Sequence, residues 1–72
     1  MVNIQKLKGI IVEKETTQGI LANVIGVDRS TFYRKLREGG SKLTVEEVEK
    51  ICKYLKLETG EMLDIFFNNI GA

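Results

Sequence analysis

Apolar residues along the chain recur every three or four positions, which is the spacing of amphipathic helices. No stretch alternates in the manner of a strand, and the 72 residues include no proline. The first half of the pattern predicts three helices, over about residues 3–14, 18–25 and 28–37. Their core-facing positions are Ile4, Leu7, Ile10, Ile11, Leu21, Ala22, Ile25, Phe32 and Leu36.

Polar and glycine residues mark where these three helices begin and end. The pair Thr16-Thr17 can cap the second helix, and Asp28 can cap the third through its side-chain oxygens. Gly26 is expected to end the second helix in a left-handed conformation, and Val27 after it is expected in the core. The pair Gly39-Gly40 ends the third helix.

The C-terminal half predicts two more helices, at about residues 44–67. Thr44 and Glu47 are spaced as a capping box, in which each side chain bonds to the backbone N–H of the other residue. The buried stripe that follows is Val45, Val48, Ile51, Cys52 and Leu55. Thr59 is expected to cap the last helix, whose apolar residues are Met62, Leu63, Phe66 and Phe67. The predicted fold is all-α, a compact five-helix bundle forming one domain over residues 1–72.

The composition is that of a small globular protein, with 43% hydrophobic and 29% charged residues. No apolar run approaches the roughly 18 residues of a transmembrane helix, and no signal peptide opens the chain. A cytoplasmic protein without membrane contact is therefore expected. The single cysteine, Cys52, lies in an apolar stripe, which favours a small core residue over a reactive thiol.

Side chains suited to catalysis are scarce. The chain has no histidine, which is the commonest general base, and one cysteine is too few for a thiolate zinc cage. No phosphate-binding glycine loop and no nucleophile motif occurs. We therefore expect no enzymatic activity, no cofactor, no metal and no small-molecule substrate.

The net charge of +1 conceals an uneven distribution. Residues 28–42 carry five basic against two acidic side chains, a net charge of +3, whereas residues 43–72 carry three against six, a net charge of −3. Four of the basic residues fall within the predicted third helix. A basic patch backed by an acidic remainder can orient a molecule towards a polyanion.

Residues 16–36, TTQGILANVIGVDRSTFYRKL, resemble the helix-turn-helix of the lambda repressor, Cro and Xre family. The matching marks are Gln18, Leu21-Ala22, Gly26, Val27, Arg29-Ser30-Thr31 and the apolar residue at position 32. The order of helices also matches over about residues 4–67, with the helix-turn-helix motif at about 17–37. The segment TFYRKL and the C-terminal Ile65-Phe66-Phe67 most resemble the sequences of small phage-encoded regulators of Gram-positive hosts.

The resemblance implies that the third helix enters the major groove of double-stranded DNA, with its N-terminal residues at the base edges. Arg34 is the strongest candidate, because it lies opposite the core-facing side of this helix. The base-reading candidates are Asp28, Arg29, Ser30, Tyr33 and Arg34. The candidates for phosphate contact, which positions a protein without specifying sequence, are Gln18, Thr31, Lys35, Arg37, Ser41 and Lys42.

Several of these assignments have a plainer alternative. Arg34 can form a surface ion pair with Glu38. Arg29 can meet a base, a phosphate or solvent, and Tyr33 can pack half-buried beside it. The carboxylate of Asp28 repels phosphate but can accept from cytosine N4, so helix capping is its main expected role.

Three apolar residues point away from the expected core. Ile20 and Val24 stand where the family usually carries Glu, Lys or Gln, and Val12 lies off the stripe of the first helix. Exposed apolar residues that gather on neighbouring surfaces indicate a protein-binding patch. Phe66 and Phe67 near the C-terminus extend this candidate partner surface.

The first functional hypothesis is a Cro-type transcriptional regulator that binds an operator, as a homodimer on a palindromic site. Phe66, Phe67 and Ile70 are the expected dimer surface, with closure of the core as the alternative for Phe66. The rival is a phage antirepressor or modulator, which binds the lysogeny repressor protein through Val12, Ile20 and Val24 or through the third helix itself. The basic third helix favours DNA, whereas the near-zero net charge and the apolar outer residues favour the rival; an antitoxin of similar fold is a weaker third reading.

Overall fold

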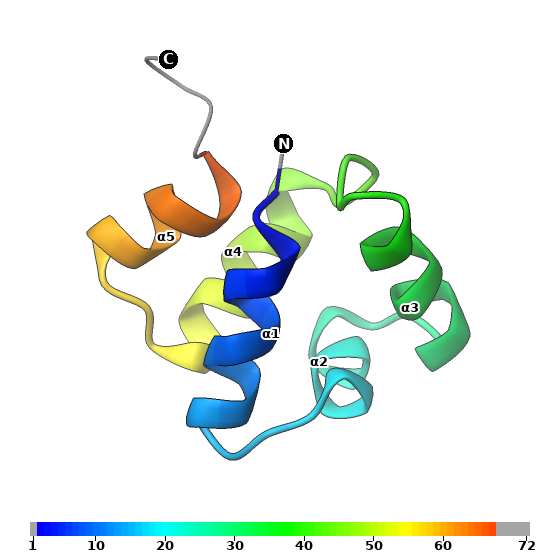
Figure 1. The fold of residues 1–72 in the computed structure, drawn as a ribbon. Coiled ribbons are helices and arrows are strands. Elements are labelled where there is room, and N and C mark those ends of the chain that lie inside the picture. Colours follow the sequence, from blue (N-terminus) through cyan, green and yellow to red (C-terminus); the bar gives the residue numbers. More distant parts are fainter. Residues whose placement is uncertain (1, 68–72) are drawn as a thin grey trace.

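The structure is a computed structural model that describes residues 2–67. These residues form five helices and no strand, as the all-α prediction requires: α1 (Ile4–Glu13), α2 (Gln18–Ile25), α3 (Arg29–Arg37), α4 (Val45–Leu55) and α5 (Thr59–Phe66). In Figure 1, α1 and α4 occupy the centre, with α5 on one side and α2 and α3 on the other. Within residues 2–67, no helix combines the length and the apolar content needed to cross a membrane.

The core is a single cluster of apolar side chains to which every helix contributes. Phe32, Leu7, Leu21, Ile51 and Ile65 are fully enclosed. The complete cluster is Leu7, Ile10, Ile11, Leu21, Ala22, Ile25, Phe32, Leu36, Ile51, Leu55, Ile65 and Phe66. Cys52 packs half-buried against this cluster, and burial, with the Glu49 carboxylate as a smaller cause, raises the pKa of its thiol.

The caps follow the predictions with one exception. The Thr17 hydroxyl accepts from the Ile20 N–H at 3.1 Å, and both bonds of the Thr44–Glu47 capping box form at 3.0 Å. The prediction for α5 was wrong by one residue. Thr59 is the first helical residue and Glu58 is the N-cap, because the Glu61 side chain accepts from the Glu58 N–H at 3.2 Å.

Val45, which was expected in the buried stripe of α4, lies on the surface instead, and so does the apolar Leu63 of α5. Val45 is 73% exposed and Leu63 is 47% exposed. Val45 is the first residue of α4, where no neighbouring helix covers it, and Ile65 takes the buried position on α5 in place of Leu63. The helical period gives the direction of a side chain around its axis but not whether another helix covers that direction.

The N-terminus is held against α5 and the α3–α4 loop. The Asn3 N–H donates to the Ile65 carbonyl at 2.6 Å, and the Lys6 ammonium lies 3.0 Å from the Asp64 carboxylate. Gly40 lies beneath Val2, and a Cβ at Gly40 would come within 2.7 Å of it. With its φ of 76°, this position suits glycine, which has no Cβ to resist a left-handed conformation.

Candidate nucleic-acid interface

The turn that joins α2 to α3 is fixed by backbone bonds. Gly26 ends α2 in the left-handed conformation that the sequence predicted, with φ 79°. The Gly26 N–H donates to the Asn23 carbonyl at 3.1 Å, and the Val27 N–H donates to the Ala22 carbonyl at 3.0 Å. Ala22 is 1% exposed, and its small side chain lets α3 approach α2 closely. These two bonds fix the backbone of the turn between α2 and α3.

Asp28 caps α3, as predicted. Its Oδ2 accepts from the Ser30 N–H at 3.1 Å and from the Ser30 hydroxyl. These hydrogen bonds, the hydroxyl first, lower the pKa of Asp28 below its ordinary value, because they stabilise the ionised carboxylate. The Ser30 hydroxyl proton is engaged by this cap, so Ser30 faces a partner mainly with its oxygen lone pairs.

Two residues attach α3 to the core and leave its opposite side in solvent. Phe32 is 0% exposed and Leu36 is 3% exposed. The exposed residues of α3, which we call the recognition face, are Arg29, Ser30, Tyr33, Arg34 and Arg37. Tyr33 is 43% exposed, so its ring can contact a partner.

The arginines of the recognition face carry uncompensated charge. Within residues 2–67, Arg29, Arg34 and Arg37 have no carboxylate oxygen within 4.0 Å. The alternative in which Arg34 pairs with Glu38 is therefore not adopted. Three unpaired guanidinium groups on one short helix form a local positive surface suited to a polyanion.

Lys35, predicted as a phosphate contact, forms an ion pair within the protein. Its ammonium lies 3.0 Å and 3.1 Å from the two carboxylate oxygens of Glu47 on α4, and both side chains are less than one-fifth exposed. Burial alone would raise the pKa of Glu47, but hydrogen bonds from the Thr44 backbone and from Lys35 outweigh it and lower this pKa. Lys35 therefore joins α3 to α4, and its charge is neutralised.

The other phosphate-contact candidates lie around this helix pair. Gln18 is the first residue of α2 and is half-buried, as is Thr31 in α3. Ser41 and Lys42 are exposed in the loop between α3 and α4. None of these four makes a side-chain hydrogen bond within the described part of the chain.

The candidate partner surface on α1 and α2 is smaller than the sequence predicted. Val12 is 74% exposed and Ile20 is 44% exposed, but Val24 is half-buried and packs against the core. Tyr54 of α4, which sequence reasoning missed, is 44% exposed and lines the same hollow as Ile20. Tyr54 lies three positions after the buried Ile51 and so on a neighbouring part of the same helix face. The sequence pattern therefore did not indicate that Tyr54 is exposed.

The C-terminal aromatic residues have separate positions. Phe66 is 7% exposed and closes the core, whereas Phe67 is 36% exposed. Of the two interpretations of Phe66, the structure adopts closure of the core, and Ile70 lies outside the described residues. Of the two phenylalanines, Phe67 is the one whose ring is exposed.

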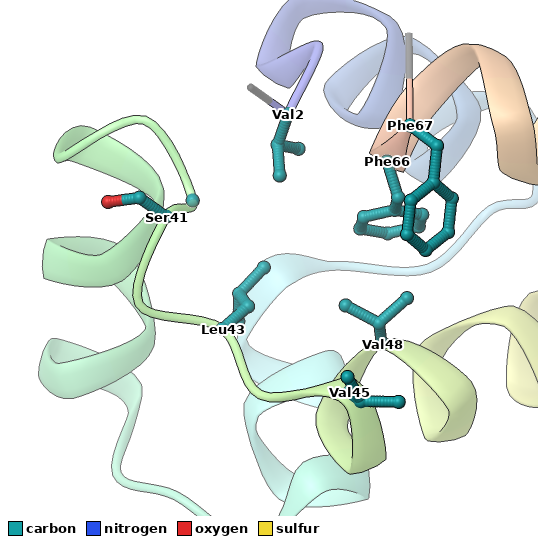
Figure 2. Close-up of a pocket in the computed structure, with 8 residues that line it drawn as sticks. Val2, Ser41, Leu43, Val45, Val48, Phe66 and Phe67 are labelled. Carbon is teal, nitrogen blue, oxygen red and sulfur yellow. The ribbon is translucent and has the colours of Figure 1, made fainter. Parts of the chain in front are cut away.

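Phe67 lies at the edge of an apolar groove between the N-terminus of α4 and the end of α5. Figure 2 shows the two Phe rings facing Val45 and Val48 across it. The groove has a volume of about 250 Å³. It is lined by Val2, Gly40, Ser41, Leu43, Val45, Val48, Phe66 and Phe67, and we call it the α4–α5 groove.

Comparison with known proteins agrees with this geometry. The family model described as Cro/C1-type HTH DNA-binding domain matches residues 6–68, which confirms the resemblance to the lambda repressor, Cro and Xre family. The comparison with curated proteins found no match, and neither did the comparison with solved structures. The match includes α2, the turn and α3.

Proposed function

Because the chain belongs to the Cro/C1-type helix-turn-helix DNA-binding family, we propose that it is a sequence-specific regulator that inserts α3 into the major groove of an operator. We further propose a repressor of the Cro type, serving phage or prophage lysogeny control in the cytoplasm of a bacterial host. One observation carries the proposal: α3 is anchored by Phe32 and Leu36, while its exposed arginines have no carboxylate partner within residues 2–67.

The residues of the recognition face have different roles in this proposal. Arg34, opposite the anchored side, is suited to pair with guanine O6 and N7, the commonest specific contact in the major groove. Ser30 and Tyr33 accompany it at the base edges. Arg37 and Lys42 contact phosphates, which fixes the register of the protein on the duplex.

The test of the whole proposal is selection of binding sites from random duplex DNA at low and moderate salt. An enriched palindrome with half-sites about one helical turn apart, near 10 bp, is the expected result. Binding without enrichment that vanishes as salt rises would reflect only counterion release, and would contradict sequence-specific recognition.

Arg34→Ala tests the recognition helix directly. Loss of one bidentate guanine contact costs roughly 1–3 kcal/mol and relaxes the preference at one base position. Fluorescence anisotropy on the selected operator measures the loss, and Lys53→Ala on α4 is the control for removing an exposed positive charge. An Arg34→Ala protein that binds the operator as tightly as wild type would remove this assignment.

A second candidate function is a modulator that binds the lysogeny repressor of the same phage. The exposed Val12 and Ile20 support it, because each leaves apolar surface open to solvent. Ile20→Asp separates the two functions: it should abolish a complex with the repressor and spare direct binding to DNA. Val24 is unsuitable for this test, because a charge there would disturb the core.

A further inference from the structure

The guanidinium of Arg29 rests on the backbone of α2 at Gly19. A Cβ placed at Gly19 would lie 3.0 Å from Nε, 3.1 Å from Nη2 and 3.4 Å from Cζ of Arg29. The first two separations are shorter than an ordinary van der Waals contact. The first residue of α3 therefore occupies the space in which any side chain at Gly19 would begin.

The other helical glycines show that this contact is particular to Gly19. A Cβ at Gly9 of α1 or at Gly60 of α5 would meet nothing within 4 Å. Gly60 is also the second residue of its helix, as Gly19 is of α2. Glycine weakens a helix relative to alanine. At Gly19 the contact with Arg29 explains why glycine is present, whereas Gly60 has no such contact.

We propose that Gly19 is a positioning residue for DNA recognition, which holds the Arg29 guanidinium against α2 and so sets where Arg29 meets the DNA. The inference rests on the proposed function. Within the described residues no carboxylate pairs with Arg29 and no side-chain hydrogen bond holds it, so the packing on Gly19 is the restraint that the structure shows. A side chain held in place before binding loses less conformational freedom when it binds.

A methyl group at Gly19 acts on the arginine rather than on the helix. The backbone of α2 is fixed by the Thr17 cap and by the burial of Leu21 and Ala22. The guanidinium is the far end of a flexible side chain, so rotation of Arg29 is the easiest way to relieve the contact. Gly19→Ala should therefore keep the fold, favour the helix and displace Arg29.

The test is a double-mutant cycle on the selected operator, read by fluorescence anisotropy. Arg29→Ala should weaken binding about 5- to 150-fold, the range for one lost arginine contact. Gly19→Ala alone should weaken binding by about fivefold or more within that range, and should add nothing in the Arg29→Ala background. Gly60→Ala, the matched control, should bind within about twofold of wild type.

Two results would overturn the inference: a Gly19→Ala protein that binds like Gly60→Ala, or one that loses as much affinity with Arg29 removed as with Arg29 present. A second readout needs no DNA. The ¹⁵N–¹H heteronuclear Overhauser effect of the Arg29 Nε–H should be high in wild type and in Gly60→Ala, and should fall in Gly19→Ala. If site selection fails while this difference is observed, the DNA-binding proposal is wrong and the positioning of Arg29 stands.

Discussion

At the scale of single residues, Asp28 connects the start of α3 to the chemistry of the interface. Its carboxylate accepts two hydrogen bonds from Ser30, which fix the first turn of the helix. Through these bonds the negatively charged carboxylate interacts with hydrogen-bond donors of the protein itself. An acidic residue at the edge of a positive face is thus compatible with a polyanion partner, because its charge is already engaged.

The lowered pKa of Asp28 predicts a pH dependence of stability. A carboxylate whose folded-state pKa lies below its ordinary value of 3.8 contributes its stabilisation fully above that value and loses it as pH falls through the folded pKa. Asp28→Asn keeps a capping oxygen but cannot titrate. The difference in Tm between wild type and Asp28→Asn should be constant at neutral pH. Below about pH 4 the Tm of wild type should fall relative to that of Asp28→Asn.

Thermal unfolding by circular dichroism from pH 2.5 to 7 measures this difference. Glu13→Gln, which removes an exposed carboxylate at the end of α1, is the control for the change in net charge. A difference between wild type and Asp28→Asn that stays constant across the whole range would contradict the role of the ionised cap.

At the scale of elements, Glu47 links the start of α4 to the side of α3. One oxygen accepts from the Thr44 N–H in the capping box and also pairs with Lys35. The bridge therefore joins α3 to α4. Its two side chains are mostly buried, so removing one partner should cost roughly 1–3 kcal/mol, the range for a hydrogen bond to a charged group left unmet.

The Lys35–Glu47 bridge also predicts which basic residues of α3 contribute to the salt dependence of DNA binding. Each phosphate contact contributes about −0.9 to the slope of log K against log salt concentration. Arg37→Gln should make the slope shallower by about this amount, whereas Lys35→Gln should leave it unchanged, because Glu47 already neutralises Lys35. Titrations at four or five salt concentrations, at a temperature where every variant is folded, measure the slopes.

Glu47→Gln is the complementary variant. It frees the Lys35 ammonium and should steepen the slope by up to about 0.9. If Lys35→Gln instead makes the slope shallower as Arg37→Gln does, then Lys35 leaves Glu47 when DNA binds, and the original prediction of a phosphate contact is correct.

The difference between what could and could not be predicted from sequence follows the range of each interaction. The Thr44–Glu47 capping box and the Asp28 cap are local, since their partners lie within four residues, and both were predicted. The Lys35–Glu47 bridge joins residues twelve positions apart on two helices. No periodicity gives the angle between those helices, so the bridge appeared only in the structure.

The same limit applies to the candidate site. The inner and outer sides of α3 follow from Phe32 and Leu36 with the helical period alone. That Arg29 turns back onto Gly19 depends on the packing of α3 against α2. The exposure of Val45 likewise depends on which helices reach the first turn of α4.

At the scale of the whole molecule, a single small module buries about 600–1,000 Å² of its own surface when it binds DNA. This area is too small for high affinity. A dimer doubles the interface and reads a palindrome with half-sites one turn apart. The α4–α5 groove suits self-association, because an apolar hollow is bordered by the exposed Val45 and Phe67. We therefore propose that two copies meet at this groove, with Val45 and Phe67 as its exposed contacts.

Val45→Asp tests that placement, and the chain offers a closely matched control. Val45 is 73% exposed and Val12, on α1 away from the groove, is 74% exposed, so neither substitution should disturb the core. A charge at the groove must be desolvated when two copies meet, which weakens the contact.

Val45→Asp should therefore shift sedimentation equilibrium towards monomer and weaken binding to the full palindrome, while binding to a single half-site stays unchanged. Val12→Asp should behave as wild type in all three measurements. Equal behaviour of the two variants would mean that the copies meet elsewhere, or that the protein binds its operator as a monomer.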